Sequence, residues 1–273
     1  MKIWATMLAV PEFSRLFTMI TKRFLLLVGS VLFALAFISS CSSDDVGDGL
    51  LEYGGHKYKI VVVDGRELMA ENLNYDVQGS KCYDNSSGNC AKYGRLYNWA
   101  MAMNLPSSCI ARSCADSIKT PHRGICPSGW HIPTNAEWDK LYRFVDGDKG
   151  TKSPYGSLTA GRYLKAKEGW NHCGPSISSS SFSSSSSSGS SSSSSLDKVY
   201  LCDDTLDFAA LPGGYDNLIG FYEAGEHGYW WSASEKEEDV SIAYKRYIFN
   251  RNDEAYWGYG IKNYLFSVRC FKD

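Results

Sequence analysis

Nine cysteines constrain this 273-residue chain more than any other feature of its sequence. The first of them, Cys41, stands apart because it ends a segment typical of a secretion signal. Lys22 and Arg23 form a basic start, and residues 24–37 are an apolar run shorter than the roughly 20 residues of a membrane-spanning helix. Export to an oxidising compartment leaves eight further cysteines, an even number that predicts four disulfides.

The residues around Cys41 indicate how the chain is anchored. Ile38-Ser-Ser-Cys41 resembles the lipobox of bacterial lipoproteins, in which the cysteine is diacylated and begins the mature protein. We therefore expect a signal peptide at residues 1–40, with Met19 as an alternative start, and a flexible acidic tether at 41–51. An ordinary cleaved signal and an uncleaved anchor are the alternatives.

Charge near the lipid site suggests where the domain resides. Asp44-Asp45 resembles the acidic export signals of surface lipoproteins, which predicts an outer-membrane anchor with the domain facing outward; retention in the periplasm is the alternative. Residues 1–40 hold four basic and one acidic side chain, so 24 basic and 29 acidic side chains remain of the 28 and 30 in the full chain. This balance argues against a nucleic-acid partner.

The spacing of the eight cysteines favours one of the 105 pairings that eight cysteines allow. Two pairs would close short loops, one pair would bracket a Ser-rich segment, and one pair is left over. The resulting pairs are Cys82 with Cys90, Cys109 with Cys114, Cys173 with Cys202, and Cys126 with Cys270.

Two helices are expected. Thr134 and Glu137 have the spacing of a capping box, and the apolar residues that follow recur at helical intervals until Gly147. An earlier helix is predicted over residues 94–104, where Leu96, Trp99 and Met103 share one face.

Strands and loops account for most of the remaining sequence. Residues 58–63 and 67–73 flank Asp64-Gly65 and predict a hairpin, and residues 83–89 have the composition of a loop. Three aromatic and β-branched runs, at 228–234, 243–250 and 265–271, predict antiparallel strands. Residues 176–195 are almost all Ser, which predicts a disordered insertion within one domain spanning 52–273; an interdomain linker is the alternative.

Several motifs together resemble the FISUMP family, the Fibrobacter succinogenes major paralogous domain. The matching stretches are Leu68-Met-Ala-Glu-Asn-Leu-Asn-Tyr75, Tyr93-Gly-Arg-Leu-Tyr-Asn-Trp99, Cys126-Pro-Ser-Gly-Trp-His-Ile-Pro-Thr-Asn-Ala-Glu-Trp138, Phe208-Ala-Ala-Leu-Pro-Gly-Gly214, Tyr229-Trp-Trp-Ser-Ala-Ser234 and Ser267-Val-Arg-Cys270. The resemblance implies a secreted bacterial lipoprotein domain with a C-type-lectin-like fold. We therefore expect an α+β, disulfide-stapled domain with two helices, short antiparallel strands and long loops.

Residues 132–138 also resemble a stretch of formylglycine-generating enzymes, which bind copper through a C-x4-C pair near their end. The C-x4-C pair here, Cys109 and Cys114, lies upstream of that stretch, so we interpret it as a structural staple. No G-x-S-x-G motif occurs, and the five histidines are dispersed. We therefore expect a protein that is not an enzyme, with an enzyme of the formylglycine-generating type as the less favoured alternative.

The sequence offers little for a metal. Neither a C-x2-C nor an H-x3-H pair is present, and the sugar-binding calcium motifs of C-type lectins are missing. Calcium remains a candidate cofactor through three acidic residues that could supply oxygen ligands, Asp203, Asp204 and Asp207.

Eighteen Tyr and eight Trp exceed what a core of this size needs, and many of them fall in the last sixty residues. Exposed aromatic rings stack on sugars or anchor protein partners, and alternation along a strand should turn at least one of residues 229–231 away from the core. The ligand-binding candidates are Tyr222, Tyr229, Trp230, Trp231, Tyr256, Trp257 and Tyr259. We expect a glycan, or another component of the cell envelope or plant wall, as ligand, with an adhesion or scaffold role through a surface protein as the alternative.

Overall fold

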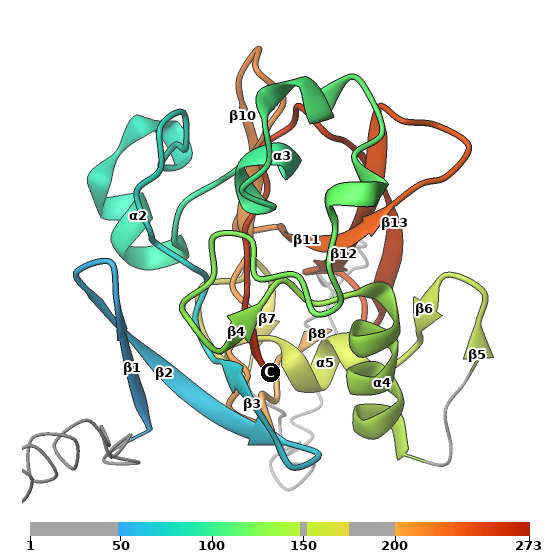
Figure 1. Cartoon of the computed structure of the whole chain (residues 1–273). Coiled ribbons are helices and arrows are strands. Elements are labelled where there is room, and N and C mark those ends of the chain that lie inside the picture. Colours follow the sequence, from blue (N-terminus) through green and yellow to red (C-terminus); the bar gives the residue numbers. More distant parts are fainter. Residues whose placement is uncertain (1–48, 148–151, 175–199) are drawn as a thin grey trace, which may run out of the picture. The chain divides into compact units, whose positions relative to one another are not determined.

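The computed structural model describes residues 49–147, 152–174 and 200–273 (Figure 1). The expected signal peptide, Cys41, most of the tether and the Ser-rich insertion lie outside these residues. Leu50 and Leu51 were expected in the tether, but they pair with Lys59 and Tyr58 in an antiparallel ladder. Within the described ranges, no helix combines the length and apolar character that a membrane span requires.

The first sheet joins the beginning and the end of the described chain. Its five strands run in the order β1-β2-β3-β14-β4. Their bounds are β1 (Leu50–Tyr53), β2 (His56–Val63), β3 (Arg66–Met69), β14 (Phe271–Lys272) and β4 (Trp130–His131). Asp64 and Gly65 both have positive φ, as a two-residue hairpin turn requires, so the predicted hairpin is confirmed, although β3 ends at Met69 rather than at Leu73.

A second five-stranded sheet carries most of the aromatic residues, in the order β11-β12-β13-β6-β5. Its strands are β11 (His227–Glu235), β12 (Ile242–Phe249), β13 (Ala255–Ile261), β6 (Gly156–Ser157) and β5 (Lys152–Ser153). Sequence patterns located β11 and β12 but missed β13, in which two glycines interrupt the strand-forming residues. Of the expected strand at 265–271, the structure places only Phe271 in a named strand.

Two smaller sheets complete the strand content of the described residues. They pair β9 (Gly213–Asp216) with β10 (Phe221–Ala224), and β7 (Cys173–Gly174) with β8 (Tyr200–Leu201). The described residues therefore form an α+β domain.

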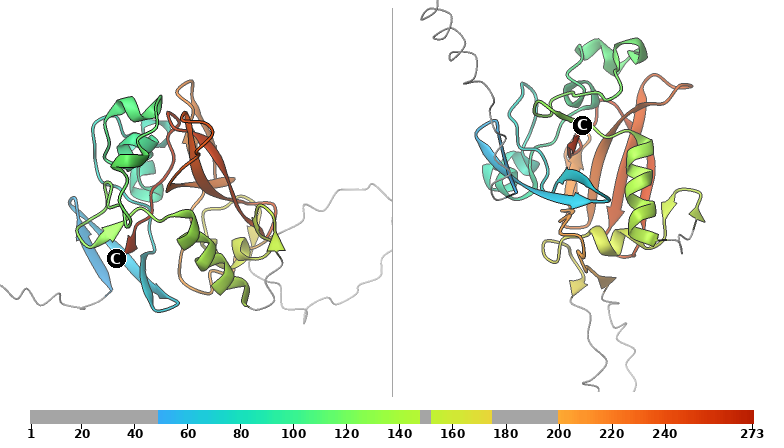
Figure 2. Two further views of the ribbon diagram at one scale, coloured as in Figure 1. Left: turned by 45° about the vertical axis from the view of Figure 1, so that its right-hand side comes forward. Right: turned by 60° about the horizontal axis from the view of Figure 1, so that its bottom comes forward.

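The helix predicted from the capping box is confirmed as α4 (Asn135–Asp146). The Thr134 N–H donates to Glu137 Oε2 at 2.9 Å, and the Thr134 hydroxyl accepts the Glu137 N–H at 3.3 Å. Trp138, Leu141 and Tyr142 are buried on one side of the helix. In the right-hand view of Figure 2, α4 runs along one face of the β11–β12–β13 sheet.

The prediction for residues 94–104 is wrong in extent. Only α3 (Trp99–Ala102) is helical, and it begins after Asn98, whose side chain accepts the Met101 N–H at 2.9 Å. Leu96 and Tyr97 are extended instead, because they form bridges with Lys81 and Phe266. The apolar residues at helical spacing therefore lie partly in this extended segment and only partly in a helix.

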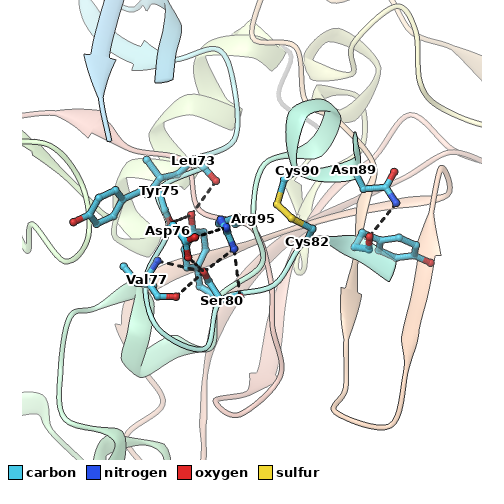
Figure 3. The surroundings of a disulfide bond; sticks show 11 residues. Leu73, Tyr75, Asp76, Val77, Ser80, Cys82, Asn89, Cys90 and Arg95 are labelled. Atoms are coloured by element: carbon cyan, nitrogen blue, oxygen red, sulfur yellow. Dashed lines mark hydrogen bonds and ion pairs between the residues drawn. A yellow bond between two sulfur atoms is a disulfide. The ribbon is translucent and has the colours of Figure 1, made fainter. Parts of the chain in front are cut away.

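The stretch between Cys82 and Cys90 is likewise more ordered than a loop. It contains the 3-10 helix η1 (Tyr83–Asn85) and most of the first turn of α2 (Ser87–Tyr93), which ends beyond the disulfide (Figure 3). Beside it, Arg95 Nη2 donates to Asp76 Oδ2 at 2.6 Å. The remaining helices are α5 (Ala160–Leu164), η2 (Ser107–Ile110) and η3 (Ala115–Ser117).

Four disulfides join the cysteines in the pairs that spacing favoured. They are Cys82–Cys90, Cys109–Cys114, Cys126–Cys270 and Cys173–Cys202. The third links residues 144 positions apart and ties the segment before α4 to the residue that precedes β14. The fourth closes the base of the Ser-rich insertion.

Candidate functional site

Both faces of the second sheet are covered at β11. Tyr229 and Trp231 belong to one hydrophobic cluster, with Trp99 and Phe266, whereas Trp230 belongs to another, with Trp138. Trp230 and Trp231 are 1% and 0% exposed. The expectation that one of residues 229–231 turns away from the core is therefore wrong: the residues do alternate, but each face meets its own core.

The two indole N–H groups are also engaged inside the protein. Trp230 Nε1 donates to Asn72 Oδ1 at 2.8 Å, and Trp231 Nε1 donates to the Tyr97 carbonyl at 2.7 Å. A ligand cannot reach either ring without unfolding the sheet, so Trp230 and Trp231 are core residues rather than binding residues.

Four other rings adjoin one another at the protein surface, and we call them the outer aromatic surface: the exposed Tyr155 and Tyr259 and the half-buried Tyr244 and Trp257. Tyr155 is 62% and Tyr259 39% exposed. The centroid of Trp257 lies 6.3 Å from that of Tyr155, 5.7 Å from that of Tyr244 and 5.8 Å from that of Tyr259. Trp257 therefore sits at the middle of the surface.

Strand pairing assembles this surface from distant parts of the sequence. Tyr244 of β12 lies opposite Tyr259 of β13. Tyr155 comes from the turn between β5 and β6, and its carbonyl accepts the Trp257 N–H at 2.7 Å. The turn approaches β13 this closely because Gly156, at φ +144°, has no Cβ; an added Cβ would lie 2.0 Å from the Ala255 carbonyl oxygen.

Polar groups border the four rings. Lys236 Nζ lies 4.5 Å from the Tyr259 ring centroid, and the Tyr259 hydroxyl donates to the Tyr244 hydroxyl at 3.4 Å. This hydrogen bond, with a smaller contribution from burial, raises the pKa of Tyr244 to about 12. The Tyr244 phenol is therefore neutral near neutral pH, and its hydroxyl is available as a hydrogen-bond donor and acceptor beside the ring faces.

A different group of side chains occupies the opposite face of the sheet. We call it the Lys245 cluster, and it comprises Glu223, His227, Tyr229, Lys245 and Tyr247. Lys245 Nζ lies 4.3 Å from the Tyr229 ring centroid and 5.3 Å from that of Tyr247. Burial lowers the pKa of Lys245 to about 8, against the opposing charge of Glu223. Glu223 also accepts the Tyr229 hydroxyl at 2.7 Å.

The remaining sequence candidates lie near the Lys245 cluster rather than on the outer aromatic surface. Tyr256 stacks on Tyr247, with centroids 5.0 Å apart and planes 12° from parallel. Tyr222 is 41% exposed and lies 5.6 Å from Tyr215. The seven candidates therefore divide among the core, the outer surface and the opposite face, and do not form one site.

Sequence reasoning missed Tyr155 and Tyr244. Tyr244 also lies in the last sixty residues, but twelve positions before the Tyr256-Trp257 pair. Tyr155 lies in a turn about a hundred residues from its neighbour Trp257. Only the alternation of Tyr244 with the buried Ala243 gave a local signal that its ring leaves the core.

The three aspartates considered for calcium have other surroundings. Asp203 Oδ2 accepts from Arg162 Nε at 2.5 Å, and the buried Asp204 accepts the Ala209 N–H at 2.9 Å. Asp207 is exposed. Across the residues that the structure describes, no three His, Cys, Asp or Glu side chains are grouped so as to hold a metal ion.

A cavity of about 670 Å³ lies elsewhere, beside His131. His131 Nδ1 is 2.7 Å from Asp273 Oδ1, and its Nε2 is 2.9 Å from Glu137 Oε1. Because both ring nitrogens contact carboxylates, His131 links β4, α4 and the residue after β14, a structural role.

A family model described as the Fibrobacter succinogenes major domain matches residues 56–272. No curated protein and no solved structure gives a significant match.

Proposed function

We propose, from the premise that this chain belongs to the Fibrobacter succinogenes major domain family, that it is a lipid-anchored surface protein whose domain binds a glycan. The ligand class is a polysaccharide of a cell envelope or plant wall. The proposed role is binding without catalysis, because the rings and hydroxyls of the outer aromatic surface can stack on a ligand and form hydrogen bonds with it.

The outer aromatic surface is the observation that carries this proposal. Exposed Tyr and Trp faces stack on the apolar C–H faces of sugars, and hydrophobic side chains of this size seldom gather in the open without a ligand. Tyr155, Trp257 and Tyr259 offer three adjoining rings. The hydroxyls of Tyr244 and Tyr259 and the Lys236 ammonium offer polar contacts to sugar hydroxyls at the rim.

We propose further that the fold is C-type-lectin-like. The support is the order of elements that the family resemblance implied: an opening hairpin, helices, a long irregular region and late antiparallel strands. The Cys126–Cys270 disulfide and the pairing of Phe271 with Leu68 bring the last strand back to the first hairpin.

Retention of the purified protein on insoluble cellulose, insoluble xylan and bacterial sacculi tests the proposal. We expect the wild-type protein to be retained on at least one of these and Trp257→Ala to pass through. Absence of retention on all three, by protein that is folded by circular dichroism, would count against glycan binding.

Binding of a protein partner in adhesion or scaffolding is the alternative proposal. It is favoured by Ile261, which is 45% exposed and lies on β13 two residues beyond Tyr259, on the same face. A pull-down from an envelope extract would then recover a protein whose capture Ile261→Asp abolishes, while polysaccharide retention stays unchanged.

Anchoring through Cys41 is a separate proposal, supported by the lipobox-like sequence alone. Growth of the producing bacterium with an alkyne fatty acid should label the wild-type protein but not Cys41→Ala. Equal labelling of the two would contradict the anchor.

A further inference from the structure

A second cavity is lined by residues other than those of the outer aromatic surface and of the cavity beside His131. It is a cavity of about 480 Å³, a size typical of small-ligand pockets, bounded by Tyr53 and Tyr75 on one side and by residues 117–125 on the other. Asn104 and Ser117 add polar groups to its lining.

Two tyrosine rings form its wall, and both are held in place. The centroids of Tyr53 and Tyr75 are 4.7 Å apart, and the Tyr53 hydroxyl donates to the Ile125 carbonyl at 3.2 Å. Gly54 has φ +58°, and a Cβ there would lie 2.5 Å from Cδ2 of Tyr75. The β1–β2 turn therefore needs glycine for the ring to lie where it does.

The charge of this cavity sets it apart from the cavity beside His131. Its lining includes Lys119 and Arg123 but neither Asp nor Glu, whereas Glu67, Glu137 and Asp273 line the cavity beside His131. Lys119 and Arg123 form no ion pair with any residue that the structure describes. Two cations without an ion-pair partner among the described residues make this cavity electropositive.

Hydrogen bonds fix the segment that carries these cations. Arg123 Nε donates to the Cys126 carbonyl at 2.9 Å, which fixes the guanidinium beside the Tyr53 side chain. His122 Nδ1 accepts the Lys119 N–H at 3.1 Å, and its Nε2 donates to the Met103 carbonyl at 2.8 Å. The segment is therefore anchored at Lys119, His122 and Arg123.

We infer that this cavity binds a carboxylated saccharide, one whose uronate group pairs with Arg123 and Lys119 while a sugar face contacts Tyr53 and Tyr75. A guanidinium pairs with a carboxylate through two parallel hydrogen bonds, and the ammonium adds a second positive charge. The tyrosine rings supply the apolar contact that a simple anion lacks. This site goes beyond the neutral stacking proposed for the outer aromatic surface and shares no residue with it.

Isothermal titration of the purified full-length protein with trigalacturonate tests the inference, with maltotriose as the neutral counterpart. Trigalacturonate should bind more tightly than maltotriose. Arg123→Gln and Lys119→Gln should each weaken binding by roughly tenfold, the effect of one charge-assisted hydrogen bond. Lys92→Gln, a surface lysine on α2, is the matched control and should change nothing.

Three results would overturn the inference. They are equal affinity for the two trisaccharides, undiminished affinity in Arg123→Gln, and displacement of trigalacturonate by an equal concentration of inorganic phosphate. Trp257→Ala should leave this binding unchanged, which separates failure here from failure of the glycan proposal. Salt should weaken the binding of trigalacturonate, because the contact is ionic.

Discussion

His131 Nε2 lies 2.9 Å from Glu137 Oε1, while the other oxygen of the same carboxylate accepts the Thr134 N–H at 2.9 Å. One carboxylate thus caps α4 and holds the histidine of β4. Asp273 Oδ1 contacts the other ring nitrogen, Nδ1. A chain of hydrogen bonds that responds to pH therefore joins β4, α4 and the residue after β14.

The first prediction is a maximum of stability at mildly acidic pH. Burial opposes ionisation of Glu137, but the hydrogen bonds from His131 and Thr134 outweigh it and lower its pKa from 4.5 to about 2. Its contribution is therefore present above pH 4.5 and is lost as pH falls toward 2. Burial likewise opposes protonation of His131, but hydrogen bonds to Glu137 and Asp273 raise its pKa above 6.5. Its contribution to stability is therefore present below pH 6.5 and is lost as pH rises through the raised pKa.

The free energy of unfolding of the wild-type protein should peak between about pH 4.5 and 6.5. Urea denaturation across this range and to higher pH should show His131→Gln less stable at the peak by roughly 2 kcal/mol, with a smaller loss of stability above pH 6.5. Parallel profiles for the two proteins would show that this histidine contributes nothing to the pH dependence.

A second prediction concerns Asn72, which lies in one of the family-like motifs. Its Oδ1 accepts from Arg269 Nη2 and from Trp230 Nε1, each at 2.8 Å, and its Nδ2 donates to the Tyr93 carbonyl at 2.8 Å. Asn72→Leu keeps the size of the side chain but leaves the buried guanidinium short of an acceptor, and should cost about 3 kcal/mol or more.

Asn74→Leu is the matched control, because Asn74 contributes its backbone N–H, rather than its side chain, to the bond with the Tyr58 hydroxyl. It should cost less than about 1 kcal/mol in the same denaturation experiment. Similar losses for both variants would mean that Asn72 matters only as part of the loop.

The third prediction is that Lys245 titrates far below an ordinary lysine. Burial lowers its pKa from 10.5 to about 8, and the charge of Glu223 limits the decrease. An NMR titration of the lysine Cε signals should show two lysines with midpoints near 8, Lys245 and the buried Lys165, and only one of them in Lys245→Met. Removal of the negative charge in Glu223→Gln should lower the Lys245 midpoint further. A higher midpoint in this variant would contradict the assignment.

The fourth prediction compares two disulfides. Cys126–Cys270 spans 144 residues, whereas Cys109–Cys114 spans 5. By chain entropy alone, removal of the long-range bond as a double Ala variant should cost about 5 kcal/mol, and removal of the short one about 2 kcal/mol. Equal losses, measured as the free energy of unfolding, would show that local strain or packing dominates over loop closure.

Local signals predicted the elements that local chemistry determines. The capping box located α4, and Asp64-Gly65 located the β2–β3 hairpin, because a few neighbouring residues decide each. The short α3 could not be predicted, since Leu96 and Tyr97 take their conformation from Lys81 and Phe266, which are distant in sequence.

The sequence predicted that aromatic residues form the candidate surface, but it did not predict which ones. The excess of Tyr and Trp indicated exposed rings, and Trp257 and Tyr259 do lie on the outer aromatic surface. Trp230 and Trp231 were wrong, because the sequence does not reveal that both faces of the strand are covered. Tyr155 joins Trp257 through a backbone hydrogen bond that depends on the tertiary fold.

Titration of the full-length protein with cellohexaose, xylohexaose and chitohexaose, by tryptophan fluorescence and calorimetry, tests the central claim most directly. At least one should bind the wild-type protein, and Trp257→Ala should weaken that binding by roughly tenfold, the value of one stacked ring. Phe144→Ala, which removes an exposed aromatic ring from α4, should bind as the wild type does. Equal affinity in Trp257→Ala and the wild type would contradict the claim that the outer aromatic surface is the glycan site.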